Sequence, residues 1–126
     1  AVCEDVECLA DDATRADPAF LAEALQAAIA AGAAGVTVCD AAGSMLPDAF
    51  GSFVRGIYEA VPQTKDVRFG VSCSDALSMA DACAVSAIAA GVGEIKTAAY
   101  CVATANLAHL AQLLAAKAQA RCSSRR

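Results

Sequence analysis

Apolar residues recur at helical spacing along two segments of the chain, each bounded by residues that begin or end helices. The first segment follows Asp17 and Pro18, which are typical of a helix N-cap and a first helical position, and Gly32 predicts its end. A second helix follows a turn at 43–47 and ends before Pro62. The predicted buried faces consist of Phe20, Leu21, Ala24, Leu25, Ala28 and Ile29 in the first helix and of Phe50, Phe53, Val54, Ile57 and Tyr58 in the second.

Short apolar runs separate the helical segments. Predicted strands cover residues 2–8, 36–39, 67–72 and 93–98, and further predicted helices cover 75–90 and 106–119. The runs are too short and too uniformly apolar for half-exposed strands, which indicates a parallel sheet covered by helices. The sequence therefore predicts an α/β fold of four successive β/α units. A doubly wound sheet of the flavodoxin type is the alternative.

The chain also contains an internal repeat. The pentapeptide AIAAG occurs at 28–32 and again at 87–91, each time before a short β-branched run. The predicted strands and helices superimpose at the same offset. This favours a duplicated pair of β/α units over chance recurrence in an alanine-rich chain.

The length of the chain predicts one domain with unpartnered surfaces. We assign residues 1–120 to a half-barrel β/α domain and 121–126 to a basic C-terminal tail, because a closed TIM (β/α)8 barrel needs about 250 residues. Four parallel strands with helices on one side leave two edges and an inner face uncovered. We expect that inner face to be apolar and to bind a second copy or a complementary half-barrel, with Val38, Val71 and Ile95 near the contact or the shared core.

The net charge and the cysteine content limit the classes of partner and the cellular location that we expect. The formal net charge of −5 and the pI near 4.6 leave no basic stripe for phosphates, so we expect no nucleic acid partner. Residues 97–116 lack formal charge but contain polar side chains, and we expect strand, loop and helix there, not a membrane segment. Seven cysteines without a CxxC pair, and acidic residues near the N-terminus, predict a reducing, cytoplasmic location.

Three segments carry a resemblance to a known family. They read DDATRAD at 11–17, GAAGVTVCDAAG at 32–43 and SCSDALSMA at 72–80. Over about residues 6–114 the chain resembles the C-terminal half of the barrel in 2-isopropylmalate synthase and homocitrate synthase, relatives of 3-hydroxy-3-methylglutaryl-CoA lyase. Their corresponding segments read EDATRTD, then AGA with a short strand and DTVG, then HCHNDLGMA. The resemblance implies half of a TIM barrel with its site at the strand ends.

That resemblance implies metal-dependent chemistry whose ligands are missing here. In the family a divalent metal polarises a 2-oxo acid while a base takes a proton from the methyl group of acetyl-CoA. Two metal-binding histidines correspond to Ser72 and Ser74, and a serine hydroxyl is a poor ligand compared with imidazole. The third ligand would be an aspartate on the first barrel strand, which this chain does not contain. We therefore expect no cofactor, with a divalent metal only if the site is completed differently.

The resemblance also assigns positions at the strand ends. The implied catalytic positions are Asp11, Asp12, Arg15 and Asp40, and the implied substrate-binding positions are Ala41, Ser72, Ser74, Asp75 and Asn106. The family's glutamate is replaced by Asp11 and its threonine by Ala41. These losses concentrate at the site while the helix faces and glycine caps remain. That distribution favours loss of the parent activity.

Two hypotheses of function follow. The first is a catalytically degenerate relative of these synthases that acts by association or by binding a small acid or acyl-CoA. The second is an active carbon-carbon bond synthase or lyase, in which another half of the barrel supplies part of the site or the acidic residues bind a metal.

Cysteines and a histidine offer rival chemistry. Cys8, Cys39, Cys73 and Cys101 lie near predicted strand ends, where a thiolate metal site is conceivable. Strand alternation should instead turn Cys73 toward the helices, and small buried cysteines are the default interpretation. We expect His109 to lie on a helix surface and not to act as a catalytic base.

Acidic residues near the strand ends offer a further alternative, a site for a hard divalent cation. Together, Asp11, Asp12, Asp40 and Asp75 offer carboxylate oxygens for Mg²⁺ or Ca²⁺. A local pair between Asp12 and Arg15, and a helix cap at Asp75, are the favoured interpretation.

Overall fold

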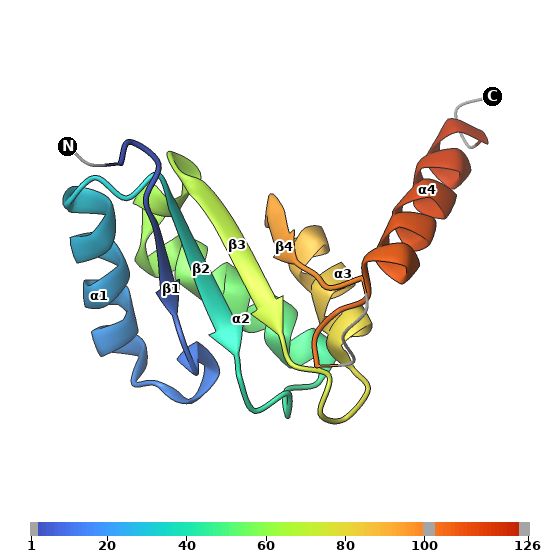
Figure 1. The fold of residues 1–126 in the computed structure, drawn as a ribbon, viewed down its shortest axis with the longest axis horizontal. Coiled ribbons are helices and arrows are strands. Elements are labelled where there is room, and N and C mark those ends of the chain that lie inside the picture. Colours follow the sequence, from blue (N-terminus) through green and yellow to red (C-terminus); the bar gives the residue numbers. More distant parts are fainter. Residues whose placement is uncertain (1–2, 100–102, 124–126) are drawn as a thin grey trace.

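The computed structural model describes residues 3–99 and 103–123. Within those residues four parallel strands form one sheet in the order β1-β2-β3-β4, and helices alternate with them (Figure 1). The strands are β1 (Glu7–Ala10), β2 (Gly35–Asp40), β3 (Arg68–Cys73) and β4 (Glu94–Lys96). The helices are α1 (Pro18–Ala30), α2 (Pro47–Ala60), α3 (Ala80–Ala90) and α4 (Leu107–Ser123), with 3₁₀ turns η1 (Ala13–Arg15) and η2 (Pro62–Lys65). The predicted succession of β/α units is confirmed.

Helix α1 begins and ends as its sequence predicts. The Asp17 carboxylate accepts a hydrogen bond from the backbone N–H of Phe20, and Pro18 occupies the first turn. Gly32 follows the helix with φ of 98°, a conformation that favours glycine. The predicted buried face is wrong at Phe20, which is 68% exposed, and at Ala24, because only the narrower stripe through Leu21 and Leu25 reaches the sheet.

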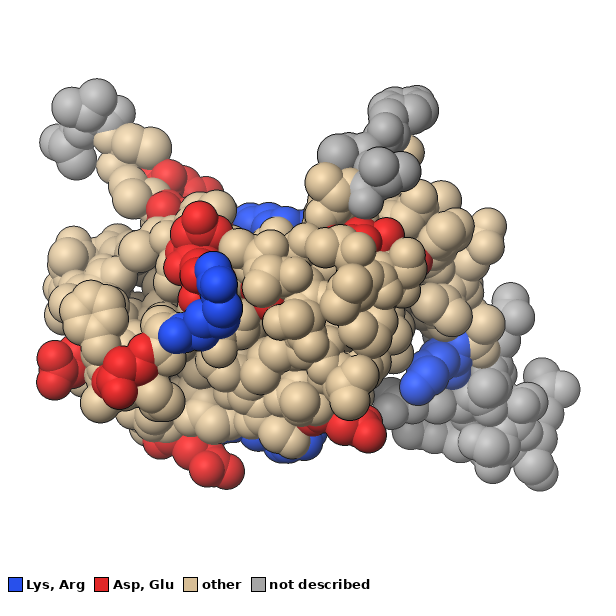
Figure 2. Space-filling view, turned by 90° about the horizontal axis from the view of Figure 1, so that it is seen from below, with Lys and Arg blue, Asp and Glu red and all other residues tan. Residues whose placement is uncertain are grey.

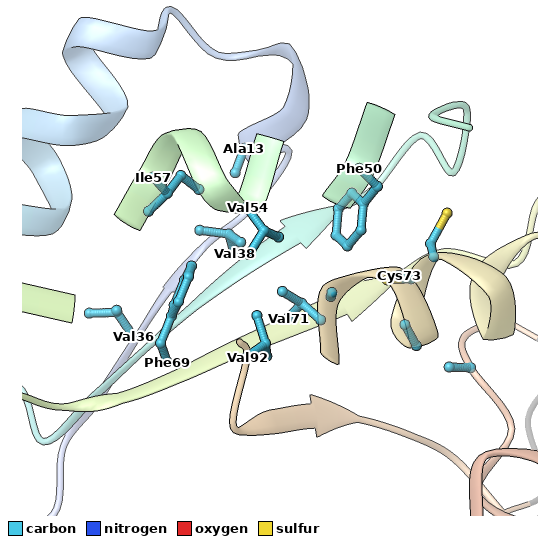
Figure 3. Packing of buried hydrophobic residues seen from close by; sticks show 14 of the residues in the cluster. Ala13, Val36, Val38, Phe50, Val54, Ile57, Phe69, Val71, Cys73 and Val92 are labelled. Atoms are coloured by element: carbon cyan, nitrogen blue, oxygen red, sulfur yellow. The ribbon is translucent and has the colours of Figure 1, made fainter. Parts of the chain in front are cut away.

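Helix α2 supplies the centre of the apolar core. Its predicted face is confirmed at Phe50, Val54 and Ile57, which are buried. Figure 3 shows these side chains lying over the sheet beside Val38 and Val71. Burying one such side chain contributes about 1.5–3 kcal/mol, so the contact between helices and sheet accounts for much of the stability of the fold.

Two aromatic residues of α2 lie at the margin of this core. Phe53 and Tyr58 are partly buried and pack against it. The Tyr58 ring meets Phe69 edge-on, with 5.0 Å between the ring centroids, and its hydroxyl donates to the carbonyl oxygen of Gly91 over 2.9 Å. Tyr58 therefore links α2 to the end of α3.

The structure moves several predicted boundaries. Strand β1 begins at Glu7, so most of the predicted strand at 2–8 precedes it. Helix α3 begins at Ala80 instead of residue 75, because the chain turns first through Ser78, whose φ is 56°. Helix α4 runs to Ser123, three residues into the predicted tail, and residues 124–126 lie outside the described residues.

The internal repeat coincides with the structure. Gly32 and Gly91 each follow a helix and have positive φ. Strands β2 and β4 begin at Gly35 and Glu94, with the same separation as the two glycines. The two copies of AIAAG therefore perform the same task, which is to end a helix and lead into a strand.

The sheet is curved, and its side opposite the helices is concave. In a flat four-stranded sheet, β1 and β4 would lie about 14 Å apart. Nevertheless, Lys96 Nζ on β4 lies 2.8 Å from Glu7 Oε1 on β1. The two side chains meet because curvature brings the edge strands toward each other, as closure of a barrel requires.

Candidate functional site

The predicted site residues gather at the carboxyl ends of the strands, which we call the mouth. The chain segments after β1, β2 and β3 touch there: Thr14 Oγ1 donates to Asp40 Oδ1 over 2.8 Å, and the backbone N–H of Ser74 donates to the carbonyl oxygen of Asp40 over 3.0 Å. The segment after β4 joins them through a bridge between Ser74 and Thr104. These contacts bring Asp40 and Ser74 together at the mouth, with Thr14 and Thr104 beside them.

The acidic residues after β1 are engaged locally. Asp11 Oδ1 accepts from the backbone N–H of Asp12 over 3.0 Å. Asp12 forms the expected pair with Arg15, with 2.6 Å between its Oδ2 and the Arg15 Nη2. The hydrogen bond from Arg15 lowers the pKa of Asp12, and the same contact raises the pKa of Arg15. The positive charge of Arg15 is therefore already neutralised by the carboxylate of Asp12.

Asp40 is a buried residue of the scaffold. It is 2% exposed and lies on the helix-covered side of β2, two residues after Val38. Its Oδ1 accepts from the Thr14 hydroxyl and from the backbone N–H of Gly43, over 2.8 and 3.2 Å. These bonds hold η1 and the β2–α2 turn against the strand, so this oxygen positions loops of the mouth.

Ser72 and Ser74 replace the two imidazoles that the resemblance implies. The strand register places Ser72 beside Cys39 on one side and Lys96 on the other. Ser74 follows the strand, and both serines are half-buried. The pair therefore offers two hydroxyl groups near the mouth.

Gly43 permits the close approach of the β2–α2 turn to β3. Its φ is 61°, and a Cβ at this position would lie 2.7 Å from the carbonyl oxygen of Ser74. Any larger residue would push the turn away from the strand. Ala41, an implied substrate-binding position, is exposed in the same turn.

Asp75 and Asn106 act as helix caps. Asp75 Oδ1 accepts from the backbone N–H of Ala80, the first residue of α3, over 3.1 Å, which confirms the predicted capping role. Asn106 Oδ1 accepts from the backbone N–H groups of Ala108 and His109 at the start of α4, over 2.9 and 3.2 Å. Both implied binding residues therefore have a structural role.

Asp81 is a residue that the sequence reasoning missed. Its Oδ1 accepts from the backbone N–H of Asn106 over 2.7 Å, and its Oδ2 lies 2.8 Å from His109 Nδ1. His109 itself is exposed on α4, as expected. Nothing local in the sequence indicated that Asp81 binds residues 25 and 28 positions later in the chain.

The cysteines lie on different sides of the sheet. Cys73 points into the core between sheet and helices, as strand alternation predicts, and burial raises the pKa of its thiol. Cys39 lies on the opposite face of β2, where burial, and next the charge of Asp11, raise the pKa of its thiol. A raised thiol pKa disfavours the thiolate, which is the form of cysteine that binds metals. Cys101 lies outside the described residues.

The donor set does not fit the divalent metal that the resemblance implies. Across residues 3–99 and 103–123, no three His, Cys, Asp or Glu side chains are grouped so that they could hold a metal ion. The positions of the two histidines carry hydroxyls, and Asp40, Asp12 and Asp75 are each engaged in hydrogen bonds within the scaffold. Hydroxyl groups of serine are weak ligands for cations that prefer imidazole.

The concave face carries charged side chains, contrary to the expected apolar surface. Lys96 Nζ binds Glu7 and also Glu94, and Thr37 Oγ1 donates to Glu7 Oε1 over 2.5 Å. Arg68 continues the row, 3.7 Å from Glu94. The alternation of charged and apolar residues in the strand 94–96, which reads EIK, was a signal for this face that the reasoning did not use.

The expected contact residues lie on the other face. Val38 and Val71 are fully buried under the helices, and Ile95 packs at the edge of the same core. Of the two expected placements, the one at the open face does not hold, because alternate residues of a strand point to opposite sides and these three share the helix-covered side, where the core lies.

Ion pairing shifts the acidity of the charged groups on the concave face. The hydrogen bond from Lys96, and next that from Thr37, lower the pKa of Glu7. Hydrogen bonds to Glu7 and Glu94 raise the pKa of Lys96. Lys96 is therefore a stable cation and is a poor candidate for a nucleophilic amine.

Charge is mixed over the surface at the mouth. Figure 2, which views the molecule from this end, shows acidic and basic side chains scattered over a mostly uncharged surface without a continuous basic patch. No helix among the described residues is long and apolar enough to cross a lipid bilayer.

Sequence relatives match most of the chain. A 2-isopropylmalate synthase of Clostridium kluyveri is 37% identical over 97 residues, which cover 77% of this chain and 19% of the relative. A 2-isopropylmalate synthase of Pyrococcus abyssi is 41% identical over 93 residues, covering 74% and 19%. The chain thus spans about a fifth of the length of these curated relatives.

Solved structures and a family model complete the comparison. The carboxyl transferase domain of Rhizobium etli pyruvate carboxylase has a TM-score of 0.67 at 19% identity and covers 87% of this chain and 20% of that one. A variant of this domain with pyruvate has a TM-score of 0.71 at 20% identity. These neighbours show the fold, part of a TIM barrel, and the model of the HMGL-like family matches residues 1–116. The chain belongs to the HMGL-like family.

Proposed function

We propose that this chain is a catalytically degenerate HMGL-like barrel segment that has lost metal-dependent condensation of an acyl-CoA with a 2-oxo acid. The observation that carries the proposal is the pair of serines, Ser72 and Ser74, at the positions where the resemblance places metal-binding histidines. Homology to 2-isopropylmalate synthases supports an origin in condensation or lyase-type chemistry.

The geometry of the mouth supports the loss. A replacement site would need three free donors converging on one point. Instead, Asp40 and Asp75 each direct an oxygen at backbone or hydroxyl donors of the scaffold, and Asp12 is paired with Arg15. Moving any of these carboxylates to a metal would break a cap, a turn or an ion pair.

What the mouth retains is hydrogen-bonding capacity. The side chain of Ser74 lies close to Gly43 of the β2–α2 turn, in which Ala41 is exposed. Ser72 lies between Cys39 and Lys96 in the strand register. We propose binding of a small acid or an acyl-CoA there without turnover. Such a protein acts through association or ligand binding.

Calorimetric titration tests the proposal directly. We expect no saturable binding of Mn²⁺ or Zn²⁺ to the purified chain, and no effect of either metal on binding of pyruvate as a representative 2-oxo acid. One tightly bound transition metal per chain, found by titration and elemental analysis, would overturn the proposal.

Restoring the ligands sharpens the test. Ser72→His with Ser74→His places two imidazoles two residues apart, on the same side of one strand, and we expect weak Zn²⁺ binding by the double variant and little by either single variant. The control adds two histidines at exposed positions in separate elements, Ser44→His with Ser52→His. Equal Zn²⁺ binding by the control would show that the serines are not at a latent metal site.

A second candidate function rests on the length of the relatives. The chain spans about a fifth of them, and the alternative proposal is an active synthase or lyase site that another segment of barrel completes, with a metal held partly by that segment. This alternative requires that a protein containing both segments binds metal and that Ser72→Ala weakens the binding. Unchanged metal binding in that variant would remove this chain from the site.

We also propose a cytoplasmic location. The described cysteines Cys3, Cys8, Cys39, Cys73 and Cys83 are all free thiols, which suits a reducing compartment.

A further inference from the structure

A pocket opens at the end of the sheet where the strands begin, opposite the mouth and at the top of Figure 1. Its volume is ≈ 630 Å³, which suits a small molecule. Its walls are the second half of α2, the turn η2, the start of β3 and the loop between α3 and β4. The residues that line it include Arg55, Tyr58, Glu59, Lys65, Gly91 and Gly93. Because all these walls belong to this chain, the pocket forms without a second copy or another segment of barrel.

Two glycines leave the α3–β4 side of the pocket without side chains. Gly91 ends α3 with φ of 111°, a conformation that glycine adopts without strain. Gly93 is exposed just before β4, and a Cβ at this position would meet nothing within 4 Å. Its φ is not positive, so a larger residue there would be free of backbone strain and would occupy the pocket.

An aromatic side chain provides an apolar wall. The Tyr58 ring is held edge-on against Phe69, with 5.0 Å between the ring centroids, and its hydroxyl donates to the carbonyl oxygen of Gly91 over 2.9 Å. Tyr58 is only partly buried, so part of this side chain faces the pocket that it lines. A ring fixed in this way offers an apolar contact surface to a ligand.

Two cations at the pocket have no carboxylate partner. Arg55 Nη2 donates to Ser52 Oγ, a neutral acceptor, over 3.0 Å. Across residues 3–99 and 103–123, no carboxylate lies within ion-pair distance of Arg55 or Lys65. By contrast, Arg68 and Lys96 are both ion-paired. Arg55 and Lys65 can therefore receive an anion without the loss of an existing ion pair.

The other charges at the pocket are largely balanced. Arg68 is paired with Asp5, and Glu94 contacts Lys96 and lies 3.7 Å from Arg68. Glu59 is exposed and forms no ion pair with any residue that the structure describes. The unpaired charges are therefore two cations and one carboxylate. This local positive balance is opposite in sign to the formal net charge of −5.

We propose that this pocket binds a small organic phosphate, whose anionic group contacts Arg55 and Lys65 and whose apolar part lies against Tyr58. Guanidinium and ammonium groups are the side chains that bind phosphate. Two cations match a phosphate monoester, with about two negative charges near neutral pH, better than they match a carboxylate. The site lies at the opposite end of the sheet from the mouth, so binding here goes beyond the function proposed above.

Titration with phenyl phosphate, followed by amide NMR of the 12.6 kDa chain, tests the proposal. We expect saturable shifts at Lys65, Gly91 and Gly93, with the signals of Ala41 and Gly43 at the mouth unchanged. Three other probes each lack one feature: benzoate has a single charge, inorganic phosphate has no ring and benzyl alcohol has no charge. Each should bind about tenfold more weakly. Absence of saturable binding of phenyl phosphate, shifts confined to the mouth, or equal affinity for any of the three would overturn the proposal.

Charge variants test the role of the unpaired groups. Arg55→Gln and Lys65→Gln should each weaken binding of phenyl phosphate about fivefold. Glu59→Gln should tighten it about threefold, because a nearby carboxylate repels the anion. Lys117→Gln is the matched control, since Lys117 is exposed on α4 and does not pair with a carboxylate among the described residues. Equal weakening by this control, or weaker binding by Glu59→Gln, would overturn the proposal.

A steric variant tests the location without changing charge. Gly93→Leu should abolish binding of phenyl phosphate, because the new side chain occupies the pocket. Gly56→Leu is the control: a Cβ there also meets nothing within 4 Å, but Gly56 borders the groove between α1 and α2, so binding should persist. Circular dichroism checks that both variants remain folded, and the charge variants decide the question if Gly93→Leu does not. Equal binding by the two folded variants would place the ligand elsewhere and overturn the proposal.

Discussion

The helix-covered face and the concave face of the same four strands differ in chemistry. Val36, Val38 and Val71 on the first are inaccessible to solvent. Glu7 and Lys96 on the second remain a quarter and a third exposed and form ion pairs. The first face has its partner within the chain, because α1, α2 and α3 cover it. The second keeps charges in contact with water, which makes an uncovered sheet tolerable and leaves room for a partner.

The largest expected effect lies on the helix-covered face. Phe50→Ala removes a fully buried ring from the contact between α2 and the sheet, and we expect a loss of about 3–5 kcal/mol in the free energy of unfolding. Urea denaturation followed by circular dichroism measures it. Phe20→Ala is the control, since that ring is 68% exposed, and it should cost less than about 1 kcal/mol. Similar losses would show that α2 is not the principal cover of the sheet.

The next effect tests packing on the concave face. In Gly70→Ala the new Cβ would lie 2.5 Å from Thr37 Oγ1, which is itself held by Glu7. We expect a destabilisation of about 1–3 kcal/mol from this overpacking. Thermal unfolding should show partial recovery when Thr37→Ala is added, because that change removes the clashing oxygen.

A second glycine provides the control for Gly70→Ala. A Cβ at Gly56 in α2 would meet nothing within 4 Å, so Gly56→Ala should stabilise the chain by about 0.5–1 kcal/mol through helix propensity. Destabilisation of both variants to the same extent would contradict a specific contact between Gly70 and Thr37.

A smaller effect concerns the ion pair across the concave face. Lys96→Met should cost about 1 kcal/mol at neutral pH, a modest value because both partners are partly solvated. Folding lowers the pKa of Glu7 below its ordinary value of 4.5, mainly through Lys96. The contribution of the ion pair to the free energy of unfolding is therefore fully present above pH 4.5. It is lost as the pH falls through the lowered pKa of Glu7.

Denaturation across a pH series measures this coupling. The difference in unfolding free energy between wild type and Lys96→Met should shrink as the pH falls from about 6 to about 2.5. Lys65→Met, at an exposed position of η2, should show no such trend. A difference that is constant over this range would mean that the pair does not stabilise the folded chain.

The smallest effect is a difference in thiol reactivity between the faces. Cys73 is 1% exposed under the helices and should react with a thiol reagent only after unfolding. Cys39, half-buried on the concave face with a raised pKa, should react in the folded chain but more slowly than the exposed Cys3. Mass spectrometry of labelled peptides resolves the three rates. Fast labelling of Cys73 would contradict the assignment of the two faces.

Much of the fold could be read from local signals. Asp17 and Pro18 marked the start of α1, and Gly32 and Gly91 marked helix ends, because caps and left-handed turns depend on a few adjacent residues. The order of strands and helices followed from hydrophobic spacing. The family followed from three ordered segments, since residues at strand ends stay recognisable even where the chemistry of the site has changed.

The role of individual site residues could be predicted only in part. The pair between Asp12 and Arg15 and the cap at Asp75 are interactions within a few positions, and both are present. Asp40 was expected among catalytic positions, and only the fold revealed that its oxygen holds Thr14 and Gly43. Those partners arrive from separate loops, so their meeting depends on how the strands are placed side by side.

The sequence by itself determined which segments become helices and strands, in which order they follow, and to which family they belong, because each of these depends on nearest neighbours and spacing. Only the tertiary structure decided which face of each strand the helices cover, and hence that Val38 and Val71 lie in the core. It also decided that Lys96 reaches Glu7 and that Asp81 holds Asn106 and His109. Such contacts join residues far apart in the chain, and the curvature of the sheet and the packing of its helices create them.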